Sequence, residues 1–313
     1  MLAALAGGVG AARFLAGLVQ CVDPSEITVV GNTGDDEEFF GLHVSPDLDS
    51  ITYTLAGASN TEQGWGLEGE SFRTMHALTR YGEPNWFNLG DLDLATHIFR
   101  TRRMRGDGAT LAEVTADVAA AWKLDLHLLP MTNDSVRTRI TCARSDGTRE
   151  VLAMQEWFVR ERAEPAVLQV DFDGAGTARP APGVLDALDR ADTIVICPSN
   201  PIISIGPILA IPGVRDALVR RRDRVVAVCP IIDGAPVRGP ADRLMAPLGV
   251  EVSPAGVARH YREFCATLVI DERDAAHAEA VRAAGVRPVV TETLMRSPQI
   301  AAELAQCTLA AVA

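Results

Sequence analysis

The chain has 313 residues, of which 48% are hydrophobic, enough for one large domain or for a domain with an insertion. Its formal net charge of −12 argues against a basic surface, so we expect no nucleic acid as a partner. No apolar run is long enough to span a membrane and no basic-then-apolar leader precedes the first strand, so we expect a cytoplasmic protein without membrane contact.

The first predicted element is a short apolar strand at residues 2–6, which leads into the glycine-rich turn Gly7-Gly8-Val9-Gly10 and a helix that carries Arg13. Glycines let the backbone approach an anion, and the free N–H groups at a helix start favour negative charge. Arg13 stands where a dinucleotide fingerprint has its third glycine, and no acid follows the second strand, at residues 27–30, to hold an adenosine ribose. We therefore predict a phosphate site, but not one for a nicotinamide dinucleotide.

Six acidic residues follow the second strand within a short stretch. They are Asp35, Asp36, Glu37, Glu38, Asp47 and Asp49. Hard oxygen ligands beside a phosphate loop are what a diphosphate bridged by Mg²⁺ requires. We expect Asp36 and Asp49 to face inward as the metal ligands. An ordinary solvated acidic loop is the alternative at this point.

The middle of the chain has a different pattern. Residues 50–122 are mostly helical in character, and residues 137–143 and 149–158 predict a hairpin. One of the helices should begin near Asp91 or Asp93, with His97 about one turn further on. On its own, His97 fits a structural histidine better than a catalyst.

Strand and helix signals alternate again towards the end of the chain. Strands are predicted at residues 166–170, 193–197, 225–229, 267–270 and 288–290, with helices that include 184–190 and 206–221. The pattern predicts an α/β fold with a Rossmann-like, doubly wound and mostly parallel sheet. Residues 1–49 and 160–313 would form the core, and residues 50–159 an inserted, mostly helical cap with a β-hairpin that forms one side of the cleft.

Motifs along the whole chain resemble, in the same order, those of the CofD/FbiA family, the 2-phospho-L-lactate or phosphoenolpyruvate transferases of coenzyme F420 biosynthesis. The matching segments are Gly7-Gly8-Val9-Gly10-Ala11-Ala12-Arg13, Asn32-Thr33-Gly34-Asp35-Asp36, Ser45-Pro46-Asp47-Leu48-Asp49, Gly90-Asp91-x-Asp93-x-Ala95-Thr96-His97, Leu129-Pro130-Met131-Thr132, Pro198-Ser199-Asn200-Pro201, Ser204-Ile205-Gly206-Pro207-Ile208 and Pro230-Ile231-Ile232. The Asp91–His97 and Ser199–Ile208 segments are the most specific of these.

The resemblance implies a Mg²⁺-dependent, usually dimeric transferase. It would move a phospho-carboxylic acid, such as phospholactate or phosphoenolpyruvate, from a guanosine diphosphate donor to the terminal hydroxyl of the deazaflavin Fo, and GMP would leave. The identity of the acid on the donor (lactate, enolpyruvate or glycerate) stays open.

The resemblance also implies roles for individual residues. Asp49, Asp36 and Arg13 would be catalytic, with Asp36 and Asp49 as metal ligands. The donor nucleotide and its phosphates would be bound by Gly8, Gly10, Arg13, Ser199, Asn200 and Gly206. Fo would be bound by Asp91, His97 and Thr132. An alternative is a YvcK-like regulatory protein that binds a nucleotide sugar, and Asp47, Asp49 and the Asp91–His97 segment favour the transferase over it.

Overall fold

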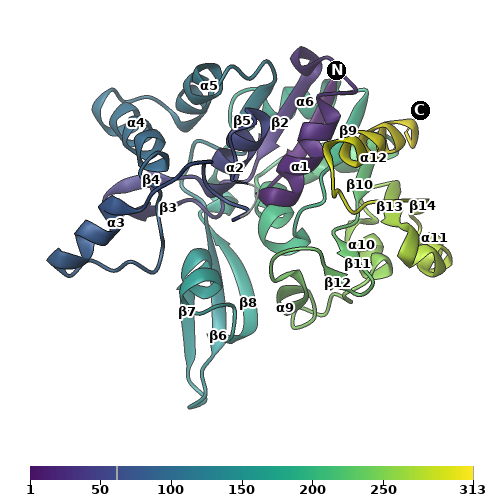
Figure 1. The fold of residues 1–313 in the computed structure, drawn as a ribbon. Coiled ribbons are helices and arrows are strands. Elements are labelled where there is room, and N and C mark those ends of the chain that lie inside the picture. The colour runs from purple at the N-terminus through teal and green to yellow at the C-terminus, as the bar shows by residue number, and fades with distance from the viewer. Residues whose placement is uncertain (61–62, 313) are drawn as a thin grey trace.

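The computed structural model describes residues 1–60 and 63–312. Its centre is a parallel sheet of seven strands in the order β14-β13-β10-β9-β1-β2-β5 (Figure 1). The strands are β1 (Leu2–Ala6), β2 (Ile27–Gly31), β5 (His127–Pro130), β9 (Thr193–Ile196), β10 (Val225–Val228), β13 (Thr267–Asp271) and β14 (Arg287–Thr291). The predicted fold class is thereby confirmed. Because the strand order changes direction beside β1, the crevice at the carboxyl ends of β1 and β9 is where a ligand is expected.

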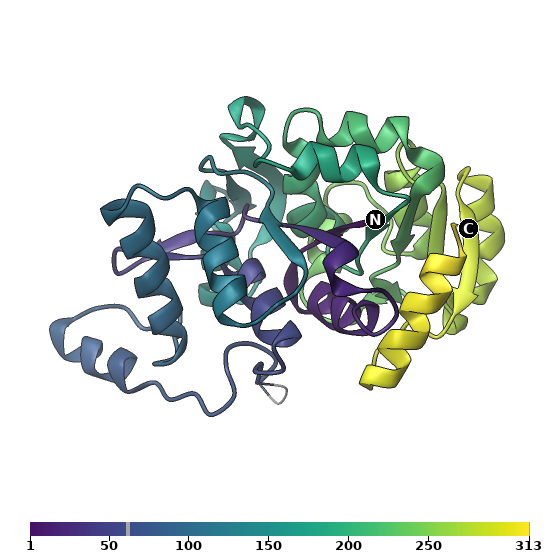
Figure 2. The same ribbon diagram turned by 90° about the horizontal axis from the view of Figure 1, so that it is seen from above.

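Helices cover both faces of this sheet, and the pleat of β1 explains how. Leu2 and Ala4 pack with α1 (Gly8–Leu18) and α12 (Pro298–Ala310) on one face. Ala3 and Leu5 point the opposite way, into the core formed with α6 (Val184–Arg190) and α8 (Val214–Arg220). Figures 1 and 2 show α12, at the end of the chain, lying beside α1 at its beginning.

The segment between β2 and β5 lies at the far side of the molecule from the C-terminus (Figure 1). It consists of β3 (Glu37–Phe39), β4 (Leu42–Val44), α2 (Pro46–Leu55), α3 (Arg73–Leu78), α4 (Asp93–Gly106) and α5 (Leu111–Ala121). A capping box between Thr110 and Glu113 begins α5. The remaining elements belong to the C-terminal half: α7 (Gly206–Ala210), β11 (Ile231–Ile232), β12 (Ala235–Pro236), α9 (Ala241–Met245), α10 (Pro254–Tyr261) and α11 (Ala278–Ala283).

A small antiparallel sheet projects from the body in Figure 1. Its order is β7-β6-β8, formed by β6 (Arg137–Ala143), β7 (Arg149–Ala153) and β8 (Ala166–Asp173). The predicted hairpin is confirmed for β6 and β7, although residues 156–160 form a helical turn rather than a strand. The placement of residues 166–170 in the parallel sheet is wrong. Ala166 and Leu168 are exposed while Val167 is buried, the alternation of a strand with one solvated face.

Two other elements differ from expectation. β5 joins the parallel sheet beside β2, although its residues fall within the range predicted for the cap. The helix predicted at residues 206–221 is broken, because Pro212 and Gly213 interrupt it. Gly213 has a left-handed backbone conformation, and α8 begins at the residue after it. The boundary between the core and the cap stays a prediction.

In the described part of the chain no single helix is long and apolar enough to span a membrane. Pro201–Ala210 and Val214–Arg220, which are bent by 94° relative to each other, have the necessary length and composition only when taken together.

Candidate active site at the carboxyl edge of the sheet

The glycine turn after β1 is held in close contact with neighbouring loops. A Cβ atom on Gly10 would lie 2.5 Å from the carbonyl oxygen of Pro198, so the start of α1 can approach the loop after β9 only with glycine there. Gly8 has a φ of 76°, in the left-handed region that favours glycine. The N–H of Gly7 donates to Ser199 Oγ at 3.2 Å. The turn therefore opens α1 as predicted, with the helix start at the sheet's switch point.

Two arginines from distant parts of the chain lie near this turn. Arg13 is half-buried on α1, and Arg238 follows β12 and packs against Gly64. Burial and the nearby positive charge of Arg238 lower the pKa of Arg13. Within the described residues neither guanidinium has a carboxylate partner. Two like charges left unpaired beside a helix start favour an anion between them.

Three buried aspartates, which we call the inner acid group, lie below the turn: Asp35, Asp36 and Asp47. Asp36 accepts a hydrogen bond from Ser45 Oγ at 2.8 Å and contacts His43 Nε2 at 2.9 Å. Asp47 accepts one from Asn32 Nδ2 at 2.8 Å. The Oδ1 atoms of Asp35 and Asp36 are buried without a hydrogen-bond partner among the described residues. Unsatisfied buried carboxylate oxygens are costly unless a cation or a ligand reaches them.

Within the described residues, no arginine or lysine side chain pairs with the inner acid group, whose only contact of this kind is the His43 ring on Asp36. Burial and the charges of its neighbours raise the pKa of Asp35 well above its usual range, and burial raises that of Asp47 to about 6. Asp47 also lies against the glycine turn, since a Cβ on Gly7 would be 2.8 Å from its Oδ2. Bound phosphate at that turn would add negative charge to these carboxylates. A divalent cation bound to oxygen ligands would remove the conflict, so the residues present fit Mg²⁺.

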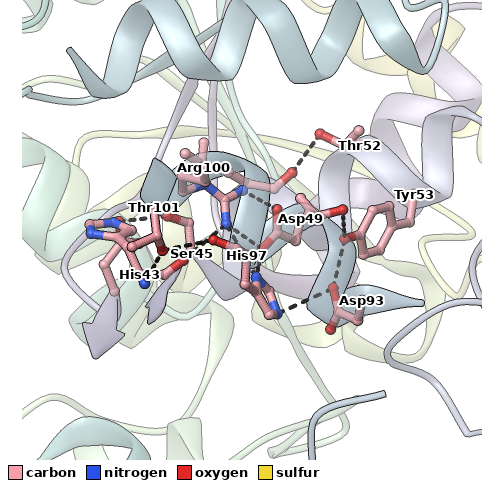
Figure 3. A network of polar contacts seen from close by, with 12 residues as sticks. His43, Ser45, Asp49, Thr52, Tyr53, Asp93, His97, Arg100 and Thr101 are labelled. Carbon is pink, nitrogen blue, oxygen red and sulfur yellow. Dashed lines mark hydrogen bonds and ion pairs between the residues drawn. The ribbon is translucent and has the colours of Figure 1, made fainter. Parts of the chain in front are cut away.

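Asp49 belongs to a second arrangement, the acid–histidine network, which Figure 3 shows. The network contains Asp49 and Tyr53 of α2 and Asp93, His97 and Arg100 of α4. Arg100 donates to both oxygens of Asp49, from Nη2 to Oδ1 and from Nη1 to Oδ2 at 3.1 Å. The negative charge of Asp49 is therefore already paired inside the protein, in contrast to the inner acid group.

His97 lies between the two carboxylates of the network. Its Nδ1 is 3.7 Å from Asp49 Oδ2, and its Nε2 is 3.4 Å from Asp93 Oδ1. Tyr53 donates its hydroxyl to Asp93 Oδ1 at 2.6 Å. Burial opposes ionisation of Asp93, but the contact with His97 outweighs it and lowers the pKa of that carboxyl. Burial and the charges of Asp49 and Asp93 raise the pKa of Tyr53, so its hydroxyl stays protonated and keeps donating.

The network also has the spacing of a metal site. Ligand atoms of Asp49, Asp93 and His97 all lie within 4.8 Å of one another. The guanidinium occupies both oxygens of Asp49, the Tyr53 hydroxyl occupies one oxygen of Asp93, and the positive charge of Arg100 repels a second cation. The network is thus better suited to a fixed hydrogen-bonding geometry than to Mg²⁺.

An apolar cavity of about 450 Å³ adjoins the network. Thr96 and Trp122 line it, and both also contact Tyr53: the Thr96 hydroxyl is hydrogen-bonded to that of Tyr53 at 2.9 Å, and the Trp122 ring centroid lies 5.4 Å from that of Tyr53. Leu92 and Phe99 of α4 form another part of the wall. A cavity of this size, apolar with a few polar groups at one end, suits an aromatic small molecule.

The residues predicted on the nucleotide side contribute in different ways. Ser199 is buried and bonded to the glycine turn. Asn200 uses its side chain to cap the helical turn Pro201–Ile205, accepting from the N–H groups of Ile202 and Ile203. Gly206 packs against Phe172, where a Cβ would lie 2.9 Å from the ring. Ser199 therefore lies nearest the predicted phosphates, while Asn200 and Gly206 shape the loop behind it.

The residues predicted on the Fo side are not gathered at one point. His97 lies in the network, but Asp91 accepts hydrogen bonds from the backbone N–H groups of Arg73 and Thr74. The helix predicted to begin near Asp91 or Asp93 is α4, which begins at Asp93; Asp91 lies two residues before it, and its carboxylate stabilises the start of α3. The hydrogen bond from the Ser71 hydroxyl, together with these backbone bonds, lowers the pKa of Asp91. Thr132, fully buried, donates to the carbonyl of Arg179 and joins the turn after β5 to that segment.

Sequence reasoning missed Arg100, Tyr53 and Arg238. Asp93, His97 and Arg100 are spaced i, i+4 and i+7, which places them on one face of a helix, and this was the available signal for Arg100. Tyr53 follows Asp49 by four residues on α2 in the same way. Arg238 is 225 positions from Arg13 in an exposed loop, and no local pattern connects the two.

The chain is similar to known proteins over most of its length. The family model described as "2-phospho-L-lactate transferase CofD" matches residues 2–307. A phosphoenolpyruvate transferase from Streptomyces griseus is 46% identical over 96% of this chain and 95% of its own. One from Thermobifida fusca is 48% identical, covering 87% of this chain and 86% of its own. A 2-phospho-L-lactate transferase from Methanosarcina acetivorans is 40% identical, covering 96% of each.

A solved structure shares the fold at low sequence identity. A member of the UPF0052 family from Bacillus halodurans has a TM-score of 0.62 and 17% identity, and the match covers 98% of both chains. That likeness concerns the fold alone. The family match and the relatives at 40–48% identity go further, because both extend over most of the chain. The chain belongs to the CofD family of transferases.

Proposed function

We propose that this protein transfers a phospho-carboxylic acid from a guanosine diphosphate donor to the terminal hydroxyl of Fo in coenzyme F420 biosynthesis. The observation that carries the proposal is that three features follow one another through residue contacts. The helix start with Arg13 and Arg238, which have no carboxylate partner among the described residues, suits the donor phosphates, and the buried acids against the glycine turn suit a metal. The apolar cavity lined by Thr96, which contacts Tyr53 of the acid–histidine network, suits a ring system.

The reaction needs positioning and charge neutralisation more than a strong base. The Fo hydroxyl oxygen forms a bond to the phosphorus that carries the acid. The bond from that phosphorus to the bridging oxygen breaks, and GMP leaves with the electron pair. Arg13 and Arg238 would stabilise the charge that develops on the leaving phosphate, and the hydroxyl would donate its hydrogen bond to Asp49, which would receive its proton.

We also propose that the inner acid group holds Mg²⁺. Asp36 keeps the role predicted from the sequence, with Asp35 and Asp47 beside it. The sequence pairs Asp49 with Asp36 as a second ligand, but the ion pair with Arg100 favours an acceptor-side role for Asp49 instead. When bound, the ion would withdraw charge from the diphosphate.

The donor acid is proposed from the relatives. The S. griseus and T. fusca proteins carry the name phosphoenolpyruvate transferase, which supports an enolpyruvyl donor over a lactyl one. That the protein is homodimeric and cytoplasmic stays a prediction.

Mass spectrometry of the products tests the function. The wild type is incubated with Fo, Mg²⁺ and, separately, guanylylated enolpyruvate, lactate and glycerate. We expect GMP and a phosphodiester of Fo in equal amounts, most rapidly with the enolpyruvyl donor. Nucleotide binding without any Fo-containing product, and without Fo binding in a fluorescence titration, would favour a regulatory protein and overturn the proposal.

A further inference from the structure

Arg100 is the most deeply buried arginine or lysine in the described part of the chain. It is 1% exposed, on a helix whose other arginines, Arg102, Arg103 and Arg105, reach the surface. Burial opposes its charge, but Asp49 outweighs that effect and raises the pKa of Arg100. A charged pair in such a place is no more stable, as a rule, than apolar residues of the same volume. Stability alone therefore does not account for it.

The side-chain contacts of Arg100 hold the carboxylate of Asp49 in one orientation. Both oxygens of Asp49 receive N–H groups of the guanidinium, and the planar fork sets the plane of the carboxylate. The backbone N–H of Asp49 is held by the carbonyl of Ser45 at the first turn of α2. His97 closes one side, with Nδ1 3.4 Å from Nη1 of Arg100. Both ends of the Asp49 side chain are thus restrained.

Arg100 also connects this carboxylate to the inner acid group. Its Nη1 lies 3.5 Å from the carbonyl oxygen of His43, and the His43 ring contacts Asp36 at 2.9 Å. The charge of Asp36 contributes to the raised pKa of Arg100. One guanidinium therefore lies between His43, which contacts the inner acid group, and the carboxylate of Asp49 (Figure 3).

We propose that Arg100 is a positioning residue for the transfer reaction: it holds the Asp49 carboxylate in the orientation that accepts the hydrogen bond of the attacking hydroxyl. The inference rests on the proposed function and adds a residue that acts only through Asp49. Arg100 itself touches neither substrate. As the oxygen–phosphorus bond forms, the hydroxyl proton passes to the fixed carboxylate and from there to water.

A double-mutant cycle tests this role, with Asp49→Asn, Arg100→Met and the double variant, and with Arg103→Met as the matched control. Arg103 lies three residues further along α4 and makes two surface ion pairs, with Asp107 and Asp117. We expect Arg100→Met to lower kcat about 100-fold and to leave the donor KM within about threefold. The double variant should be no slower than Asp49→Asn within about threefold, and Arg103→Met should match the wild type within about twofold.

Arg100→Lys separates positioning from folding. Lysine keeps the charge but lacks the fork, so we expect a kcat about tenfold above that of Arg100→Met, with a KM like that of the wild type. If Arg100→Met does not fold, Arg100→Lys alone must show a loss of kcat at unchanged Tm. The positioning role would be overturned if the fold-loss of kcat in the double variant equalled the product of the fold-losses in the two single variants. It would also be overturned if the loss of kcat paralleled the loss of Tm in every variant. A wild type that forms no product overturns the proposed function and this inference together, whereas an active wild type with wild-type kcat in Arg100→Met overturns the inference alone.

Discussion

The two groups of buried acids differ in how their charge is balanced. Among the described residues, the inner acid group has two carboxylate oxygens without partners and no arginine or lysine in contact, only the His43 ring on Asp36. In the acid–histidine network, Asp49 is paired with Arg100, and Asp93 has Tyr53 and His97. An unbalanced group is stabilised by a bound cation or by protonation, while a balanced group keeps one geometry whether or not an ion is present. The difference is the basis on which we propose metal binding for the first group and acceptor orientation for the second.

Changing Asp49 should have the largest effect on turnover. Asp49→Asn keeps the volume but loses the proton acceptor, so we expect kcat to fall about 1,000-fold with little change in donor KM. Asparagine is preferable to alanine, because alanine would leave the guanidinium of Arg100 buried and unpaired, at a cost of about 3–5 kcal/mol in stability. Steady-state kinetics and a thermal unfolding curve check this. Turnover within a few-fold of the wild type would remove Asp49 from the mechanism.

Arginine substitutions beside the glycine turn should act on the donor and not on the acceptor. Arg13→Met and Arg238→Met each remove a charged hydrogen-bond donor, so we expect the donor KM to rise about tenfold or more, with the Fo KM within about twofold. Titration of each variant with GDP and with Fo compares the two affinities directly, without turnover. An equal weakening of Fo and GDP binding would mean that these arginines do not serve the donor phosphates.

The same comparison shows what the sequence could predict. The strand, glycine turn and helix at residues 2–18 are adjacent along the chain, so their local pattern was sufficient. β5 was missed because it has four residues, with His127 and Pro130 at its ends. β8 was misplaced because its apolar residues resemble those of a parallel strand until their alternating exposure is known. Arg100 lies in an arginine-rich helix that looks like a solvated face, and its burial depends on packing against α2.

The pH dependence of stability should be the smallest of these effects. The pKa of Asp47 is raised by burial from 3.8 to about 6, and that of Asp35 is raised for the same reason. A raised carboxyl pKa contributes stability below the unfolded value and loses it as the pH rises through the folded value. Without Mg²⁺, the free energy of unfolding should therefore fall between about pH 4 and pH 7, and Mg²⁺ should raise Tm more at the upper end. Urea titrations in EDTA and in Mg²⁺ measure both, and Asp47→Asn should flatten the profile.

Metal binding to the two acid groups tests the central claim most directly. Mn²⁺, as a substitute for Mg²⁺, is titrated calorimetrically into the wild type, Asp36→Asn and Asp49→Asn in the presence of GDP. Loss of a charged ligand costs on the order of 1.5–3 kcal/mol, so we predict about a tenfold or greater loss of affinity for Asp36→Asn. For Asp49→Asn we predict affinity within about twofold of the wild type. An equal or greater loss for Asp49→Asn would contradict the assignment and make Asp49 a metal ligand.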